Sequence, residues 1–164
     1  MNQIKAIVRN QKIIVGAEEL LPRDELKEGS IKNKDTIYIG ASRELDFMLG
    51  YVYYNGVPIY SRGKYRIQVE RDYTKPIPTP PMPFCFNNLN GLLIICYELE
   101  FPQDYLHFKQ NLDFVAITIN RIMDDEDQKL LWLALIQDII NEYDCPVIVC
   151  CGGEDNNLNI SGVY

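Results

Sequence analysis

An uninterrupted apolar stretch that ends at a single cysteine constrains this chain more than any other part of its sequence. Leu92–Ile95 are all large aliphatic residues, and such a run predicts a strand that is covered on both faces. Cys96 follows directly, so we expect it at the carboxyl end of that strand, the edge of an open α/β sheet where ligands bind. A thiol in this position is either a buried core residue or a nucleophile.

The rest of the sequence alternates between expected strands and expected helices. Asn55-Gly56 separates two apolar stretches and is typical of a tight hairpin turn, because both residues tolerate a positive φ. We expect strands over residues 4–8, 12–15, 36–39, 50–54, 57–60, 65–70, 92–95, 114–119 and 146–151, and helices over about 102–111 and 125–143. This pattern predicts an α/β fold, and the length of 164 residues predicts a single domain over residues 1–164.

Composition excludes several classes of function. A net charge of −7 argues against nucleic acid as a partner, because phosphate binding needs a basic face. No apolar run is long enough for a membrane span and the first residues do not resemble a secretion signal, so we expect no membrane association and a cytoplasmic location. The five cysteines are irregularly spaced and His107 is the single histidine, which predicts reduced thiols, no metal and no cofactor.

The residues after the apolar run form a recognisable motif. Residues 96–102 read Cys-Tyr-Glu-Leu-Glu-Phe-Pro, and a glycine precedes the strand at Gly91. The whole stretch resembles the signature of the nitrilase (carbon-nitrogen hydrolase) superfamily, with Gln103 where that family usually has Glu. The resemblance implies an α-β-β-α sandwich. Because the chain is shorter than the usual domain of that family, we expect a reduced version with mixed sheets.

The resemblance also implies three catalytic groups. In that family a cysteine attacks the carbon of an amide or nitrile, a carboxylate is the general base, and a lysine stabilises the tetrahedral intermediate. Cys96 is the expected nucleophile, Lys75 in the segment Tyr73-Thr74-Lys75 matches the lysine, and Glu19 fits the base better than Glu18 because Leu20 follows it. The alternatives are that the two glutamates open a helix and that Lys75 is a surface residue.

Three further residues are expected to bind substrate. Tyr97 and Glu98 follow the cysteine, and Asn120 follows the strand predicted at 114–119, so all three are expected at the same edge. The alternatives are a salt bridge for Glu98 and an ordinary loop for Asn120. A catalytic Cys96 is further expected to be more acidic than the other four thiols.

These observations predict a hydrolase that acts on a small amide or nitrile through a cysteine thioester. The alternative is a catalytically inactive nitrilase-like protein that serves binding or assembly, since a shortened sandwich has an opened pocket. A different cysteine-dependent α/β hydrolase is a third interpretation. The resemblance also implies a homodimer or a larger homo-oligomer.

Overall fold

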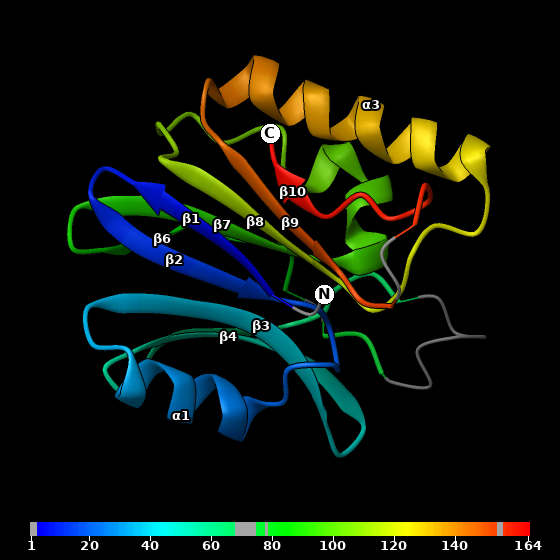
Figure 1. Cartoon of the computed structure of the whole chain (residues 1–164). Coiled ribbons are helices and arrows are strands. Elements are labelled where there is room, and N and C mark those ends of the chain that lie inside the picture. Colours follow the sequence, from blue (N-terminus) through cyan, green and yellow to red (C-terminus); the bar gives the residue numbers. More distant parts are fainter. Residues whose placement is uncertain (1–2, 68–74, 78, 154–155) are drawn as a thin grey trace.

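Two five-stranded sheets pack face to face, and in the described part of the chain one helix covers the outer face of each (Figure 1). The computed structural model describes residues 3–67, 75–77, 79–153 and 156–164. The first sheet has the order β1-β2-β3-β4-β5, and the second has the order β10-β9-β8-β7-β6. This α-β-β-α sandwich confirms the expected fold class.

The first sheet is built mainly from hairpins. Its strands are β1 (Gln3–Val8), β2 (Gln11–Gly16), β3 (Thr36–Glu44), β4 (Phe47–Tyr54) and β5 (Val57–Gly63), and the helix α1 (Arg23–Lys32) connects β2 to β3. β2 and β3 are parallel and the other neighbours are antiparallel, so the sheet is mixed. At the β4–β5 turn Asn55 and Gly56 have φ of +48° and +81°, which confirms the expected hairpin.

The second sheet has a parallel centre with antiparallel edges. Its strands are β6 (Phe84–Phe86), β7 (Leu89–Ile95), β8 (Phe114–Ile119), β9 (Val147–Cys151) and β10 (Gly162–Val163). β7, β8 and β9 run parallel, so their carboxyl ends lie at one edge, while β6 and β10 pair antiparallel outside them. The helix α3 (Glu126–Tyr143) connects β8 to β9 and covers the outer face.

The main core lies between the two sheets. Alternate residues of each strand point inward, for example Ile37 and Ile39 of β3 against Leu93 and Ile95 of β7, and all four are fully buried. The intervening residues of β7, such as Ile94, point outward and pack under α3. Both faces of β7 are therefore covered, as its apolar sequence predicts.

The structure differs from the expected elements in several places, and the short strands β6 and β10 were not expected. Helix α1 was not expected, although Asp24 and Glu25 lie in its first turn, where acidic side chains suit the helix dipole. Tyr65–Ile67 form no strand, and the remainder of the strand expected at 65–70 lies outside the described residues.

The helix expected at about 102–111 is only a short 3-10 turn over Pro102–Asp104. It ends because Tyr105 turns inward, where its buried hydroxyl donates a hydrogen bond of 2.6 Å to the carbonyl of Leu99.

Neither helix of the described chain combines the length and the apolar character that a membrane crossing requires.

Candidate active site

Cys96 occupies a strained turn at the carboxyl end of β7. Its φ is +50°, a left-handed value that costs a non-glycine residue roughly 1–3 kcal/mol. The 3-10 turn η1 (Cys96–Glu100) begins at this residue, so the chain reverses direction immediately after the strand. The turn leaves the thiol half-buried between the two sheets, where groups from the first sheet reach it.

Glu98 fixes the shape of this turn from inside. Its carboxylate accepts hydrogen bonds from the backbone N–H of Ile95 at 2.8 Å and of Tyr65 at 2.6 Å. It also forms a buried ion pair with Arg62, whose guanidinium donates to both carboxylate oxygens at 2.7 Å. Burial raises the pKa of Glu98, and Arg62 and the two N–H groups oppose that rise. The structure thus places Glu98 in a salt bridge under the turn, the alternative from sequence.

A second buried ion pair lies beside the thiol. Lys64 directly follows β5 and Glu18 follows β2, so both come from the same edge of the first sheet. The Nζ of Lys64 lies 2.9 Å from Oε1 of Glu18, and the two side chains are 0% and 1% exposed. Removing two charges from water costs several kcal/mol per ion, so such a pair is weak evidence for stability and stronger evidence for function.

The thiol of Cys96 interacts with both members of this pair. Burial raises the pKa of Cys96 well above its usual range, the charge of Glu18 and a hydrogen bond to its carboxylate raise it further, and Lys64 opposes the rise. The backbone of Asn120, which directly follows β8, also lowers the pKa of the thiol. The resting group is therefore a protonated thiol beside a carboxylate, which is the pairing that a general base needs to remove a proton.

This electrostatic arrangement corrects one expectation from sequence. Cys96 was expected to be the most acidic thiol, whereas burial raises the pKa of Cys145 and Cys151 to about 11 and also raises that of Cys96. The feature that distinguishes Cys96 is the adjacent carboxylate and ammonium, and not a thiolate at neutral pH.

Of the two adjacent glutamates, the structure brings Glu18 rather than Glu19 to the thiol. Glu19 has a φ of +61°, and its side chain accepts a hydrogen bond of 2.8 Å from the amide of Asn120 and pairs with Arg43 at 3.2 Å. The turn after β2 thus sends the two carboxylates to different partners. Sequence alone left this choice open, because neither residue belongs to a strand whose alternation would fix its direction.

Lys75 occupies the protein surface. Its Nζ binds Asp46 at 2.8 Å, the two side chains are 68% and 65% exposed, and this contact raises the pKa of Lys75. Tyr73 and Thr74 of the expected motif lie outside the described residues. The lysine that lies buried beside the thiol is Lys64, which was not expected there because β5 continues to Gly63, three residues beyond the expected end of the strand.

Tyr97 and Asn120 lie next to the thiol in different ways. The ring of Tyr97 packs edge-on against Phe101, with centroids 5.1 Å apart, and both rings line a surface pocket together with Tyr65 and Ile77. Asn120 reaches the sulfur through its backbone, as described above, while its side chain binds Glu19. Both residues were expected near the site: Tyr97 directly follows Cys96, and Asn120 follows β8, the parallel neighbour of the strand that ends at the cysteine.

Within residues 3–67, 75–77, 79–153 and 156–164, no group of three or more His, Cys, Asp or Glu side chains is arranged to hold a metal ion.

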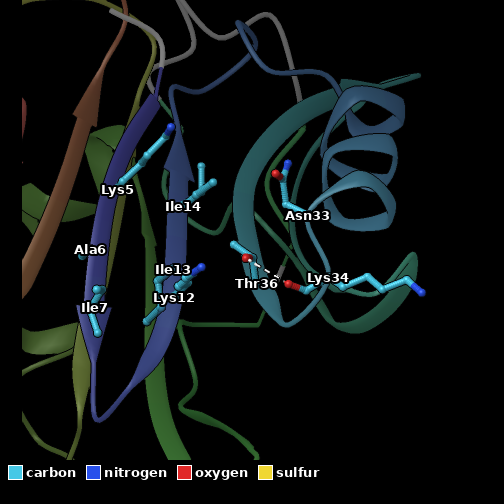
Figure 2. A pocket seen from close by; sticks show the side chains of 9 residues that line it. All are labelled: Lys5, Ala6, Ile7, Lys12, Ile13, Ile14, Asn33, Lys34 and Thr36. Atoms are coloured by element: carbon cyan, nitrogen blue, oxygen red, sulfur yellow. Dashed lines mark hydrogen bonds between the residues drawn. The ribbon is translucent and has the colours of Figure 1, made fainter.

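A separate pocket lies at the other end of the first sheet. Figure 2 shows Lys5 on β1, Lys12 and Ile14 on β2, and Asn33 and Lys34 at the end of α1 around it. Lys12 pairs with Thr36 at the start of two parallel strands, whereas Glu18 follows the end of β2. This pocket is therefore remote from the carboxyl edge that carries the thiol.

The two mixed sheets and the outer helices give a fold similar to that of solved structures from the nitrilase superfamily. An amidase from Nesterenkonia sp. AN1, described as a member of that superfamily, superposes with a TM-score of 0.64 at 12% identity, covering 79% of this chain and 52% of the amidase. A mutant of the same amidase, with acrylamide added to its active-site cysteine, gives 0.63 at 13% identity, with 79% and 53% covered.

A second enzyme shares the fold. The glutamine-dependent NAD⁺ synthetase from Acinetobacter baumannii superposes with a TM-score of 0.64 at 14% identity, covering 88% of this chain and 32% of the synthetase. The chain thus spans about half the length of the amidase and a third of the synthetase. No protein-family model matches the sequence, and comparison with curated proteins finds no match.

Proposed function

We propose that this protein hydrolyses the carbon-nitrogen bond of a small amide through a thioester on Cys96. Glu18 is the general base and Lys64 supplies the positive charge that stabilises the intermediate. The observation that carries the proposal is the buried ion pair, 2.9 Å long, whose two charges both act on the thiol of Cys96. A nucleophile, a base and a cation in contact are the parts that acyl transfer requires.

In the first half-reaction Glu18 accepts the proton of Cys96 while the sulfur attacks the carbonyl carbon of the amide. The new carbon-sulfur bond turns the carbonyl oxygen into an oxyanion, which the ammonium of Lys64 stabilises in a site with little water. The carbon-nitrogen bond then breaks, and the proton held by Glu18 passes to the leaving amine. The products are a thioester on Cys96 and free ammonia or an amine.

In the second half-reaction water replaces the amine. Glu18 takes a proton from a water molecule, the resulting hydroxide attacks the thioester carbon, and a second oxyanion forms next to Lys64. The carbon-sulfur bond breaks, the proton returns to the sulfur, and a carboxylic acid leaves. A small nitrile enters the same scheme through a thioimidate, and it is the second substrate class to test.

The experiment follows the chemistry recorded for the structural neighbours. One Nesterenkonia amidase structure contains butyramide and another contains acrylamide bonded to the active-site cysteine. We expect wild-type protein to release ammonia from butyramide and to add acrylamide at Cys96, as mapped by mass spectrometry. Cys96→Ser, Glu18→Gln and Lys64→Met should each abolish ammonia release, whereas Cys85→Ser, which changes an exposed free thiol, should retain it.

A binding or assembly protein without catalysis is the second candidate. The observation in its favour is that burial raises the pKa of Cys96 well above its usual range, which keeps the thiol protonated at rest. A wild-type protein that adds acrylamide at Cys96 no faster than at Cys85, and releases no ammonia from amides or nitriles, would exclude the hydrolase and leave this candidate.

A cytoplasmic homodimer or larger homo-oligomer completes the proposal, with residues 1–164 acting as one domain. Leu130 and Leu131 on α3 are 61% and 49% exposed, and a self-association surface would cover them. Free thiols at all five cysteines suit a reducing compartment. Light scattering of wild type and of a Leu130→Lys variant tests the assembly: a smaller particle for the variant supports it, and a wild-type monomer overturns it.

A further inference from the structure

The turn that carries the base is tied to the opposite sheet by a hydrogen bond between Asn120 and Glu19. Glu19 belongs to the first sheet's edge, where its backbone N–H donates to the carbonyl of Ala41 at 2.7 Å. Its side chain reaches the second sheet and accepts a hydrogen bond of 2.8 Å from the side-chain amide of Asn120. Arg43, the last residue but one of β3, pairs with the other carboxylate oxygen at 3.2 Å.

Asn120 is held firmly at this point. Gly152, after β9, packs so closely that a Cβ there would lie 1.9 Å from the carbonyl oxygen of Asn120, and its N–H donates to Ile119 at 2.9 Å. The backbone N–H of Asn120 in turn contacts the sulfur of Cys96. One residue therefore links the thiol, the end of β9 and the turn of the base.

The packing between the sheets does not supply this kind of restraint. The core between them is made of aliphatic side chains such as Ile39, Val15 and Ile95, whose attraction has little directional preference. A hydrogen bond to a charged acceptor fixes distance and angle, and is about twice as strong as a neutral one. Glu18 on one sheet and Cys96 on the other need such a restraint, because proton transfer requires hydrogen-bond geometry.

We propose that Glu19 is a positioning residue, which holds Glu18 against Cys96 through its hydrogen bond with the side chain of Asn120 across the two sheets. We call the contacts of Glu19 with Asn120 and Arg43 the clasp. The inference rests on the proposed function of Cys96 and Glu18, and it gives Glu19 a role distinct from that of the base. Arg43 completes the clasp by neutralising a carboxylate that lies next to that of Glu18 in the sequence.

Reversal of the hydrogen bond tests the clasp. Asn120→Asp places a carboxylate against Glu19 and removes the donor, so the rate of acrylamide addition at Cys96 should fall by roughly tenfold or more, since small displacements of reacting groups are costly. Adding Glu19→Gln restores a donor and an acceptor with the original net charge. The double variant should recover to within about threefold of wild type, as expected for two coupled residues.

Single variants separate the clasp from general stability. Glu19→Ala should slow acrylamide addition by about tenfold and reduce kcat for butyramide more than it changes KM, while Glu19→Gln alone should stay within about threefold because its carbonyl oxygen still accepts from Asn120. Glu44→Ala, which removes another half-exposed carboxylate paired with an arginine, is the matched control and should keep the wild-type rate.

The outcomes are distinct for the clasp and for the hydrolase. The clasp is overturned if Glu19→Ala adds acrylamide at the wild-type rate, or if Glu19→Gln fails to restore Asn120→Asp although the double variant has the wild-type melting temperature. In another outcome the wild-type protein hydrolyses neither amides nor nitriles, while Glu19→Gln still restores acrylamide addition to Asn120→Asp. In that case the clasp stands and the hydrolase proposal fails. Should Glu19→Ala not fold, the reversal pair decides alone.

Discussion

Lys64 and Glu18 form an ion pair 2.9 Å long in which neither side chain is more than 1% exposed, and the charge of the same carboxylate raises the pKa of the Cys96 thiol. The two charged residues come from the ends of β5 and β2 in the first sheet, and the thiol comes from β7 in the second. The site therefore depends on how the two sheets meet. The variants Glu18→Gln, Lys64→Met and Gly152→Ala each change one contact where the two sheets join.

Glu18→Gln should make the thiol of Cys96 more acidic and yet slow the hydrolysis. The charge of Glu18 and its hydrogen bond both raise the pKa of the thiol, so their removal should lower that pKa and shift the pH profile of iodoacetamide labelling to lower pH. Hydrolysis should fall by about 10²-fold or more, because the general base is lost. Labelling mapped to Cys96 between pH 6 and 11 measures the shift; an unchanged or higher pKa would contradict the arrangement.

Lys64→Met should destabilise the fold through the charge that it leaves behind. Breaking a buried pair by removing one partner costs about 3–5 kcal/mol, since Glu18 then remains buried without its cation. The double variant Lys64→Met with Glu18→Gln should recover much of that loss, because no uncompensated charge remains. Urea unfolding of the three proteins gives the free energies, and a double variant less stable than Lys64→Met would refute the explanation.

Gly152→Ala should weaken the site without touching a charged group. The added Cβ would lie 1.9 Å from the carbonyl oxygen of Asn120 and 2.2 Å from the side chain of Leu20, so the backbone at Asn120 must shift. Because the N–H of Asn120 contacts the sulfur, acrylamide addition at Cys96 should slow by about tenfold.

Gly162→Ala is the matched control for this glycine, since its nearest neighbour would lie at 3.6 Å. In this control variant, acrylamide should add to Cys96 at the wild-type rate. Equal rates for both glycine variants would show that the close contact at Gly152 has no influence on the thiol.

The sequence predicted the parts of the site that depend on local pattern. The apolar run Leu92–Ile95 fixes a strand covered on both faces, and the motif after it places Cys96 at the strand end, as observed. The hairpin at Asn55-Gly56 follows from residues that tolerate a positive φ. These features need only a few neighbouring residues to be specified.

The base and the lysine depend on contacts between sheets, which a single sequence does not display. Whether Glu18 or Glu19 turns toward the thiol is decided by the left-handed backbone of Glu19 and by its partners Arg43 and Asn120. Glu19 and Asn120 are 101 positions apart in the chain, so no local pattern reveals their contact.

The sequence motif Tyr73-Thr74-Lys75 pointed to Lys75, whereas the lysine beside the thiol is Lys64. The length of β5 determines the position of Lys64. Arg62 and Lys64 are alternate residues at the end of this strand, and both point inward to bind buried glutamates, Glu98 and Glu18. A lysine and an arginine two positions apart in an expected hairpin gave no signal that both are buried, because charged residues usually lie at the surface.

Lys75→Ala is the direct comparison between the two lysines. Lys75 binds Asp46 at the surface, where solvent screens the pair, so its removal should leave acrylamide addition at Cys96 and ammonia release within about twofold of wild type. The loss of Lys75 should also let the pKa of Asp46 rise toward its usual value, since their hydrogen bond lowers it. Side-by-side assays of Lys75→Ala and Lys64→Met decide the assignment: if Lys75→Ala abolishes ammonia release and Lys64→Met retains it, the ammonium of the site is Lys75, and the buried pair of Lys64 with Glu18 serves another purpose.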